Sequence, residues 1–246
     1  MKKLLVFTWF CFVGSARADQ ILVDFELVPS QSLLQVGGYA QFGTLQYPAT
    51  PQADGSFVAQ WVGTIHASVN RGGIDPIAIE INPSTIDALP SGNWQPNETP
   101  ADYGLTVIGV NGAIRDFTLD LSQLGTNLGA GGTFAAALNV LGTGTLDVAT
   151  GSSYPISSVG SFTPGLASLT SAPLPNGDNL WTLVLPVQMT WVLPDDALTV
   201  VGTLEGFLTA TADVPPPPVV NFPEPASLTL ACVGLALVIA WRGWRV

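Results

Sequence analysis

The stretch SFVAQWVGTIHASVN, residues 56–70, decides the fold class because apolar and polar side chains alternate along it. One face carries Phe57, Ala59, Trp61, Gly63, Ile65, Ala67 and Val69. The other face carries Gln60, Thr64, His66, Ser68 and Asn70, together with Val58 and Val62. Successive side chains of a β-strand point to opposite faces of the sheet, so this alternation predicts a long strand with one buried face.

Two later stretches repeat the pattern. Residues 180–193, LWTLVLPVQMTWVL, place Trp181, Leu183, Leu185, Val187, Met189, Trp191 and Leu193 on one face. Residues 198–212, LTVVGTLEGFLTATA, place Leu198, Val200, Leu204, Leu208 and Ala210 inward. Pro186 has no backbone N–H to donate to a neighbouring strand, so the first of these strands is expected at an edge or at a bend.

Turn-forming residues separate the alternating runs. Asp54-Gly55, Asn111-Gly112 and Asn176-Gly177 each lie between β-patterned segments, and their composition suits tight hairpins. Pro194-Asp195-Asp196 marks a fourth turn.

Residues 19–213 contain no amphipathic helical pattern, so they are predicted to form an all-β, antiparallel domain with about ten to thirteen strands. Gly63, Gly202 and Gly206 interrupt long strands, which predicts strongly curved sheets. A barrel and a two-sheet sandwich both fit this pattern, and the sequence leaves the choice between them open.

The first 18 residues have the composition of a secretory signal peptide. Two lysines precede an apolar run from Leu4 to Val13, and Ala16 and Ala18 supply the small residues of a cleavage site after Ala18. The domain that follows is therefore expected to lie outside the cytoplasm.

The expected exterior is strongly acidic. Between Asp19 and Pro218 there are 17 acidic residues against two arginines, a net charge of −15, and there is no lysine. Such a charge repels the phosphates of nucleic acids and anionic lipid head groups, so a nucleic-acid partner is excluded.

Residue types that carry common enzyme chemistry are scarce. Cys11 lies in the predicted signal peptide and Cys232 in the C-terminal apolar run, so residues 19–213 have no disulfide and no thiol nucleophile. His66 is the only histidine, which excludes the usual zinc sites. The sequence has no phosphate-binding loop, no dinucleotide glycine motif and no calcium-loop motif. We therefore expect no enzyme activity, no cofactor and no metal. Two alternatives stay open in the sequence: a calcium site built from scattered carboxylates, and a carboxylate pair for glycoside hydrolysis that would meet only in space.

The chain ends in a segment with a different character. Residues 214–222, VPPPPVVNF, form a proline-rich linker that favours an extended spacer. Pro223, Glu224 and Pro225 follow, and residues 226–241 carry no charge. Extended to residue 244, this run is long enough to cross a bilayer as one helix, 226–244. Its predicted flank is formed by Trp241, Arg242, Trp244 and Arg245, which favour a cytoplasmic C-terminus.

The order of Pro-Glu-Pro, apolar helix and terminal arginines resembles the PEP-CTERM sorting signal of exosortase-processed bacterial proteins. The resemblance covers residues 223–246 only, and Ala226 stands where the family often has serine. It implies that an exosortase, a membrane-embedded peptidase, recognises Pro223, Glu224 and Pro225. It also implies that the exterior is anchored in the inner membrane and then passed to the cell surface or the extracellular matrix.

The most distinctive loop of the exterior is PSGNWQPNETPADYG, residues 90–104. Trp94 lies there among glycine, amide and proline residues, where a tryptophan serves either as a lid over the core or as an exposed platform for sugar rings. Trp94 is therefore a candidate ligand contact.

These observations lead to three functional hypotheses for the exterior. The first is a non-enzymatic surface or matrix protein with a structural or interaction role, which predicts no pocket. The second is a carbohydrate-binding module that uses the loop around Trp94, with exopolysaccharide as its partner. The third is a carrier that encloses an apolar ligand, which predicts an unfilled apolar cavity.

Overall fold

The computed structural model describes residues 19–159, 165–194 and 199–218. Every strand pairing in it is antiparallel, which confirms the predicted all-β, antiparallel fold. No helix in these ranges is both long enough and apolar enough to cross a membrane. The predicted signal peptide, the sorting motif and the predicted helix 226–244 lie outside the described residues.

The described residues form more strand segments than the ten to thirteen predicted, because several long strands are interrupted. The strands are β1 (Asp19–Leu27), β2 (Leu33–Phe42), β3 (Leu45–Pro48), β4 (Thr50–Pro51), β5 (Val58–Gly72), β6 (Asp75–Ala88), β7 (Gly92–Trp94), β8 (Thr99–Ala101), β9 (Tyr103–Val107), β10 (Val110–Asn127), β11 (Thr133–Ala136), β12 (Asn139–Val148), β13 (Ser153–Val159), β14 (Gly165–Pro173), β15 (Asn179–Pro194) and β16 (Thr199–Val214). Two short 3-10 turns are η1 (Pro29–Gln31) and η2 (Ala130–Gly132).

Several strands of the sheet are interrupted, so that two or three segments follow one another along the same strand position. Such a set of consecutive segments is here called a lane. β10, for example, pairs with β9 through residues 110–114 and with β6 through residues 118–127, so β6 and β9 form one lane. The lanes in chain order are β1–β2, β3–β4–β5, β6–β9, β10, β11–β12, β13–β14, β15 and β16. β7 and β8 pair only with each other and form a hairpin that leaves the third lane.

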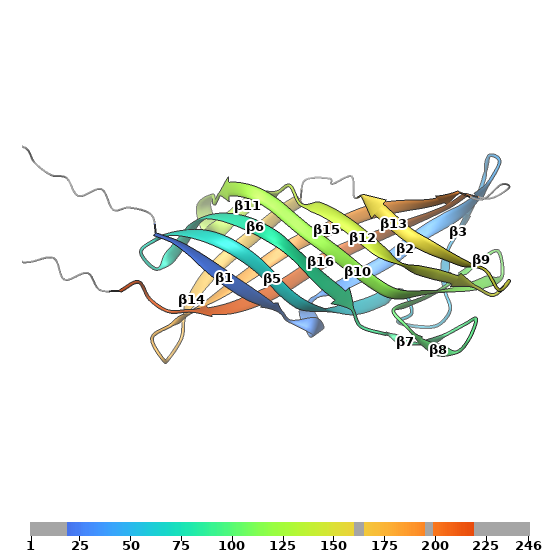
Figure 1. The fold of residues 1–246 in the computed structure, drawn as a ribbon, viewed down its shortest axis with the longest axis horizontal. Helices are drawn as coiled ribbons and strands as arrows, with labels where there is room; N and C mark the ends of the chain where they lie inside the picture. The colour runs from blue at the N-terminus through green and yellow to red at the C-terminus, as the bar shows by residue number, and fades with distance from the viewer. Residues whose placement is uncertain (1–18, 160–164, 195–198, 219–246) are drawn as a thin grey trace, which may run out of the picture. The chain divides into compact units, whose positions relative to one another are not determined.

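The last lane pairs with the first, so the sheet closes on itself (Figure 1). Residues 199–207 of β16 pair with β2, and residues 210–211 of β16 pair with β1. The chain therefore enters β1 and leaves β16 at the same end of the closed sheet.

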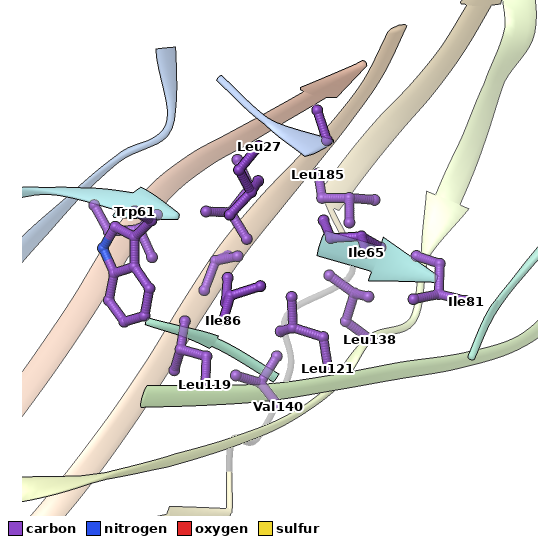
Figure 2. Packing of buried hydrophobic residues seen from close by; sticks show 14 of the residues in the cluster. Leu27, Trp61, Ile65, Ile81, Ile86, Leu119, Leu121, Leu138, Val140 and Leu185 are labelled. Atoms are coloured by element: carbon purple, nitrogen blue, oxygen red, sulfur yellow. The ribbon is translucent and has the colours of Figure 1, made fainter. Parts of the chain in front are cut away.

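Apolar side chains fill the middle of the closed sheet (Figure 2). The ring centroids of Trp61 and Phe117 lie 5.9 Å apart in an edge-on contact, and Phe117 lies 5.8 Å from Trp191. The inward face predicted for residues 57–69 is confirmed, because Ala59, Trp61, Ile65, Ala67 and Val69 are buried. Each large side chain buried in this way stabilises the fold by about 1.5–3 kcal/mol.

β15 confirms the buried face predicted for it, but it is not an edge strand, because it pairs with both β14 and β16. Trp181, Leu183, Leu185, Val187, Met189 and Trp191 are buried on one face. Its ladder with β14 ends at the pair Ser168–Val184, two residues before Pro186. Pro186 thus follows directly after the point where hydrogen bonding to β14 stops, and its missing N–H interrupts no pairing with that strand.

The predicted curvature is also present. Gly63 has φ +128° and lies where the register between β5 and β6 shifts, and Gly206 has φ +150° within β16. Both are conformations that residues with a Cβ rarely adopt. Glycine therefore allows long strands to bend around the interior.

One of the three predicted tight hairpins lies where the sequence placed it, because Asn176-Gly177 is in the loop between the paired strands β14 and β15. Asp54-Gly55 forms a turn before β5 but no hairpin, since β4 pairs with β9 and not with β5. The prediction for Asn111-Gly112 is wrong, because both residues lie inside β10. The hairpin loop is instead Ile108-Gly109, with φ of +52° and +74°, flanked by the pair Val107–Val110.

Arg71 holds together the end of the sheet where the chain enters and leaves. Its guanidinium, which is buried, donates from Nε and Nη2 to Asp19 Oδ2 at 3.1 and 2.8 Å. Its Nη1 donates to the carbonyl oxygen of Pro215 at 3.0 Å. One side chain of β5 therefore fixes the first residue of β1 and the residue that follows β16.

Candidate ligand pocket at the mouth of the sheet

An apolar pocket of about 340 Å³ lies inside the closed sheet, at the end opposite the first residue of β1 and the last residue of β16. Segments from all lanes except the second contribute to its wall. Its lining residues are Ala40, Leu105, Val107, Ile108, Val110, Asn111, Gly112, Leu146, Val148, Thr150, Tyr154, Leu193 and Val200. We call this space the mouth pocket.

The pocket exists because small residues occupy inward positions near this end. Ala40 pairs with Val200 across the β2–β16 ladder, and both line the pocket. Gly112 pairs with Leu105 on one side and Val148 on the other, and it lines the pocket without a side chain; an added Cβ would already lie 3.2 Å from Leu146 Cδ1. Deeper inside the closed sheet, large side chains such as the Trp61 indole fill the interior (Figure 2).

The floor of the pocket leads towards the core. A smaller void of about 20 Å³ shares Leu105, Val107, Leu146 and Val200 with the mouth pocket and is also lined by Trp191 and Ile114. Trp191 packs on Gly202, where an added Cβ would lie 2.0 Å from the indole ring. The tryptophan is therefore held firmly in place beneath the open part of the interior.

Polar groups are few: Asn111 lies in β10, Tyr154 in β13 and Thr150 in the turn between β12 and β13. Asn111, Thr150 and Tyr154 contribute an amide and two hydroxyl groups to an otherwise aliphatic or glycine lining. The Asn111 Oδ1 atom accepts a hydrogen bond from the Thr106 hydroxyl at 2.7 Å, which orients the amide. A mostly apolar cavity with a few polar groups is the usual composition of a small-molecule site.

The wall formed by β9 is held by the Gln52 side chain. Its Nε2 atom donates to the carbonyl oxygens of Gln95, Leu105 and Gly112 at 3.1, 3.2 and 2.8 Å. Its Oε1 atom accepts from the Gln95 N–H at 3.0 Å. Two of these carbonyls belong to residues that line the pocket, so Gln52 fixes the backbone of the wall from outside.

Tyr103, at the start of β9, anchors the same wall in the core. Its hydroxyl accepts a hydrogen bond from Trp61 Nε1 at 3.2 Å and donates to the Leu34 carbonyl oxygen at 3.3 Å. Burial raises the pKa of the Tyr103 hydroxyl far above its usual range, so this group stays neutral and can serve both bonds.

Trp94 lies outside the pocket, in β7, and is half-buried. Its ring covers Gly92 and Gly104, and a Cβ added at either glycine would lie 2.6 Å from the ring. Its Nε1 atom donates to the Ser91 hydroxyl at 3.0 Å, and that hydroxyl donates to the Asp102 carbonyl oxygen at 2.7 Å. The ring therefore packs on the backbone of the loop, and its N–H is already in use.

Asp102 belongs to the loop of residues 90–104, and Arg115 contacts this loop from β10. Burial is the main reason that the pKa of the Asp102 carboxyl is raised to about 6, and the hydrogen bond from the Phe117 N–H, 2.9 Å, acts in the opposite direction. Arg115 Nε donates to Asp147 Oδ2 at 2.9 Å, and its Nη1 donates to the carbonyl oxygens of Thr99 and Pro100. Arg115 therefore ties β8 to β10 and β12.

His66 faces solvent on the outer side of β5, as the alternation predicts. Its Nδ1 atom lies 2.7 Å from Asp24 Oδ1, and both side chains are more than half exposed. Within residues 19–159, 165–194 and 199–218, no group of three or more His, Cys, Asp or Glu side chains could hold a metal ion.

Sequence reasoning did not identify the residues of the mouth pocket. The residues of the predicted sorting motif and membrane flank lie outside the described residues: Pro223, Glu224, Pro225, Trp241, Arg242, Trp244 and Arg245. Short inward residues such as Ala40 and Gly112 are the only signal of the pocket in the sequence, and they acquire meaning only when the lanes are closed. Comparison with protein-family models, with curated proteins and with solved structures finds no match to this chain.

Proposed function

We propose that the chain is an exported surface protein whose β domain carries a neutral, apolar small molecule in the mouth pocket. The observation that supports this function best is the pocket itself, about 340 Å³ in volume and lined mainly by aliphatic side chains. Its volume lies within the range of about 300–1,000 Å³ that small-molecule sites occupy. An unfilled apolar cavity is the feature that distinguishes the carrier hypothesis from a purely structural role.

The charge of the domain bears on the ligand. Residues 19–218 carry 17 acidic residues against two arginines, a net charge of −15, so an anionic ligand such as a fatty-acid carboxylate is disfavoured at the mouth. Asn111, Thr150 and Tyr154 can serve a small neutral polar end, such as a hydroxyl or ester group. A neutral molecule with one apolar chain or a small ring system fits these features.

Filling the pocket should abolish binding. The neutral fluorescent probe N-phenyl-1-naphthylamine is expected to bind the full chain saturably, with a rise in emission. Ala40→Phe places a ring in the pocket, since Ala40 is buried and lines it, and should weaken probe binding at least about tenfold. Fluorescence titration measures both effects.

Ala172→Phe is the matched control, because Ala172 is exposed in β14 and pairs with Leu180 at the beginning of β15, whereas the pocket uses Leu193 near its end. This variant should bind the probe like the parent. Absence of saturable binding by the parent, or equal weakening in both variants, would contradict the carrier function.

The Trp94 loop supports a carbohydrate site less well. Its ring already packs on two glycines and its N–H already donates to Ser91, so only part of the ring is free to stack on a sugar.

Display at the surface is the second half of the proposal, and it rests on sequence features alone. The signal-like residues 1–18 and the sorting motif Pro223, Glu224 and Pro225 support export followed by recognition by an exosortase.

Glu224→Ala removes the acid and leaves both prolines in place, and its direct cost at a helix N-terminus is only about 0.3–1 kcal/mol. In an exosortase-bearing host, cell fractionation is therefore expected to find this variant inserted in the inner membrane but unprocessed. Normal release of the variant to the surface would show that processing does not depend on Glu224, and retention of the parent in the membrane would show that the tail is an ordinary anchor.

A further inference from the structure

Large apolar side chains are exposed on two hairpins beside the mouth pocket. Phe42 and Leu45 are 57% and 58% exposed and are paired directly across the β2–β3 hairpin. Ile108 is 57% exposed at the loop of the β9–β10 hairpin, next to Val110, and both residues line the pocket. We call Phe42, Leu45, Ile108 and Val110 the apolar rim.

The backbone at Ile108 adds an independent observation. Ile108 has φ +52°, a left-handed conformation that disfavours β-branched residues and favours Gly, Asn and Asp. The side chain is mostly exposed, so burial within the domain does not offset this strain. An isoleucine at this position is unfavourable for the turn, and a contact of its side chain with another apolar surface would offset that cost.

The charge distribution indicates what that surface is. Residues 38–50 and 104–113, which form the two hairpins, contain no charged residue, although residues 19–218 carry a net charge of −15. An acidic partner or an anionic lipid surface would be repelled by the domain, and a basic partner would find no acid in the rim. A neutral surface with an apolar interior complements the uncharged rim, and a zwitterionic lipid bilayer has this chemistry.

We propose that the apolar rim docks on the surface of a zwitterionic lipid bilayer, so that the mouth pocket opens towards the lipid. The rim residues Ile108 and Val110 also line the pocket, so a ligand could pass between bilayer and pocket without crossing water. The exchange of ligand rests on the carrier function proposed above, whereas the docking itself does not.

The test uses the full chain with Cys11 and Cys232 replaced by serine, its C-terminal segment held in a lipid nanodisc. A polarity-sensitive dye is attached at Thr44→Cys, at the loop of the β2–β3 hairpin, or at Leu124→Cys, an exposed control position in β10. Phosphatidylcholine vesicles that contain a spin-labelled quenching lipid are then added. We expect a blue shift and quenching at position 44 and neither at position 124.

The variant Leu45→Ser/Ile108→Asn separates docking from folding. Asn tolerates the left-handed conformation, so the variant should keep or raise the Tm, while its affinity for the vesicles should fall at least about tenfold. Replacing part of the phosphatidylcholine with phosphatidylglycerol should weaken docking of the parent at low salt. Unchanged vesicle affinity in the variant, or stronger docking to the anionic vesicles, would overturn the proposal.

Failure of this proposal differs from failure of the carrier function. If the neutral probe binds and position 44 stays unquenched, the pocket takes a ligand from solution and the rim does not dock on lipid. If position 44 is quenched and no probe binds, the rim docks and the carrier function is wrong.

Discussion

Replacing Gly38 with alanine should lower the free energy of unfolding by about 3 kcal/mol or more. Gly38 has φ +137° and lies opposite Gly202 in the β2–β16 ladder, which closes the sheet. A Cβ at this position would lie 2.1 Å from the Val201 carbonyl oxygen and 2.9 Å from the Gly202 Cα atom. Both neighbours are backbone atoms, so the strands must separate to admit the methyl group.

Gly177→Ala is the matched control for this effect. Gly177 also has a positive φ, +92°, but no atom lies within 4 Å of the added Cβ. This variant should lose only the conformational cost, about 1 kcal/mol. Thermal unfolding followed by circular dichroism should show a fall in Tm of about 10 °C for Gly38→Ala and a few degrees for Gly177→Ala. Equal shifts would contradict the close approach of β2 and β16.

Replacing Asp102 with asparagine should stabilise the protein above pH 6. The pKa of Asp102 is about 6 in the folded protein, mainly because the carboxyl is buried, and the usual value of 3.8 applies when the chain is unfolded. The unfolded state therefore loses its proton first as the pH rises from about 4 to 6, and the folded state becomes relatively less stable. The shift corresponds to a loss of about 3 kcal/mol above pH 6.

Asparagine keeps a carbonyl oxygen for the Phe117 N–H and removes the ionisation. Asp102→Asn should exceed the parent in stability by about 1–3 kcal/mol at pH 8 and match it near pH 4, where both side chains are neutral. Urea unfolding at several pH values measures the difference. Asp54→Asn, at an exposed position in a turn, removes one charge without relieving burial and should show a much smaller dependence on pH. A parent that gains stability between pH 4 and 6 relative to Asp102→Asn would contradict the assignment.

The strands could be predicted because their evidence is local. The alternation in residues 57–69, the apolar face of residues 181–191 and the missing donor of Pro186 each depend on neighbours within a few residues. The structure confirms the two buried faces, in β5 and β15. β15 is not an edge strand, but its ladder with β14 stops before Pro186, where the donor is missing.

The hairpin near residue 110 shows where local evidence fails. Asn111-Gly112 has the better turn composition, yet the chain turns at Ile108-Gly109. In β10 the Asn111 side chain accepts a bond from Thr106, and its carbonyl oxygen accepts one from the Ala149 N–H. Pairing of β10 with strands on both sides therefore decides the turn, and turn propensity alone does not.

The sequence by itself determined the all-β class, the direction of each strongly alternating strand face and the acidic, disulfide-free character of residues 19–218. These follow from side-chain period and from composition, which need no knowledge of distant contacts. Tertiary structure decided the closure of the sheet, the mouth pocket and the burial of Asp102. Closure and the pocket arise where segments far apart in the chain meet: β16 on β1 and β2, and Ala40 beside Val200. Asp102 is buried where its carboxyl accepts the hydrogen bond from the Phe117 N–H of β10. The pairing register brings such segments together, and a side-chain pattern within one strand does not specify which distant strand it will face.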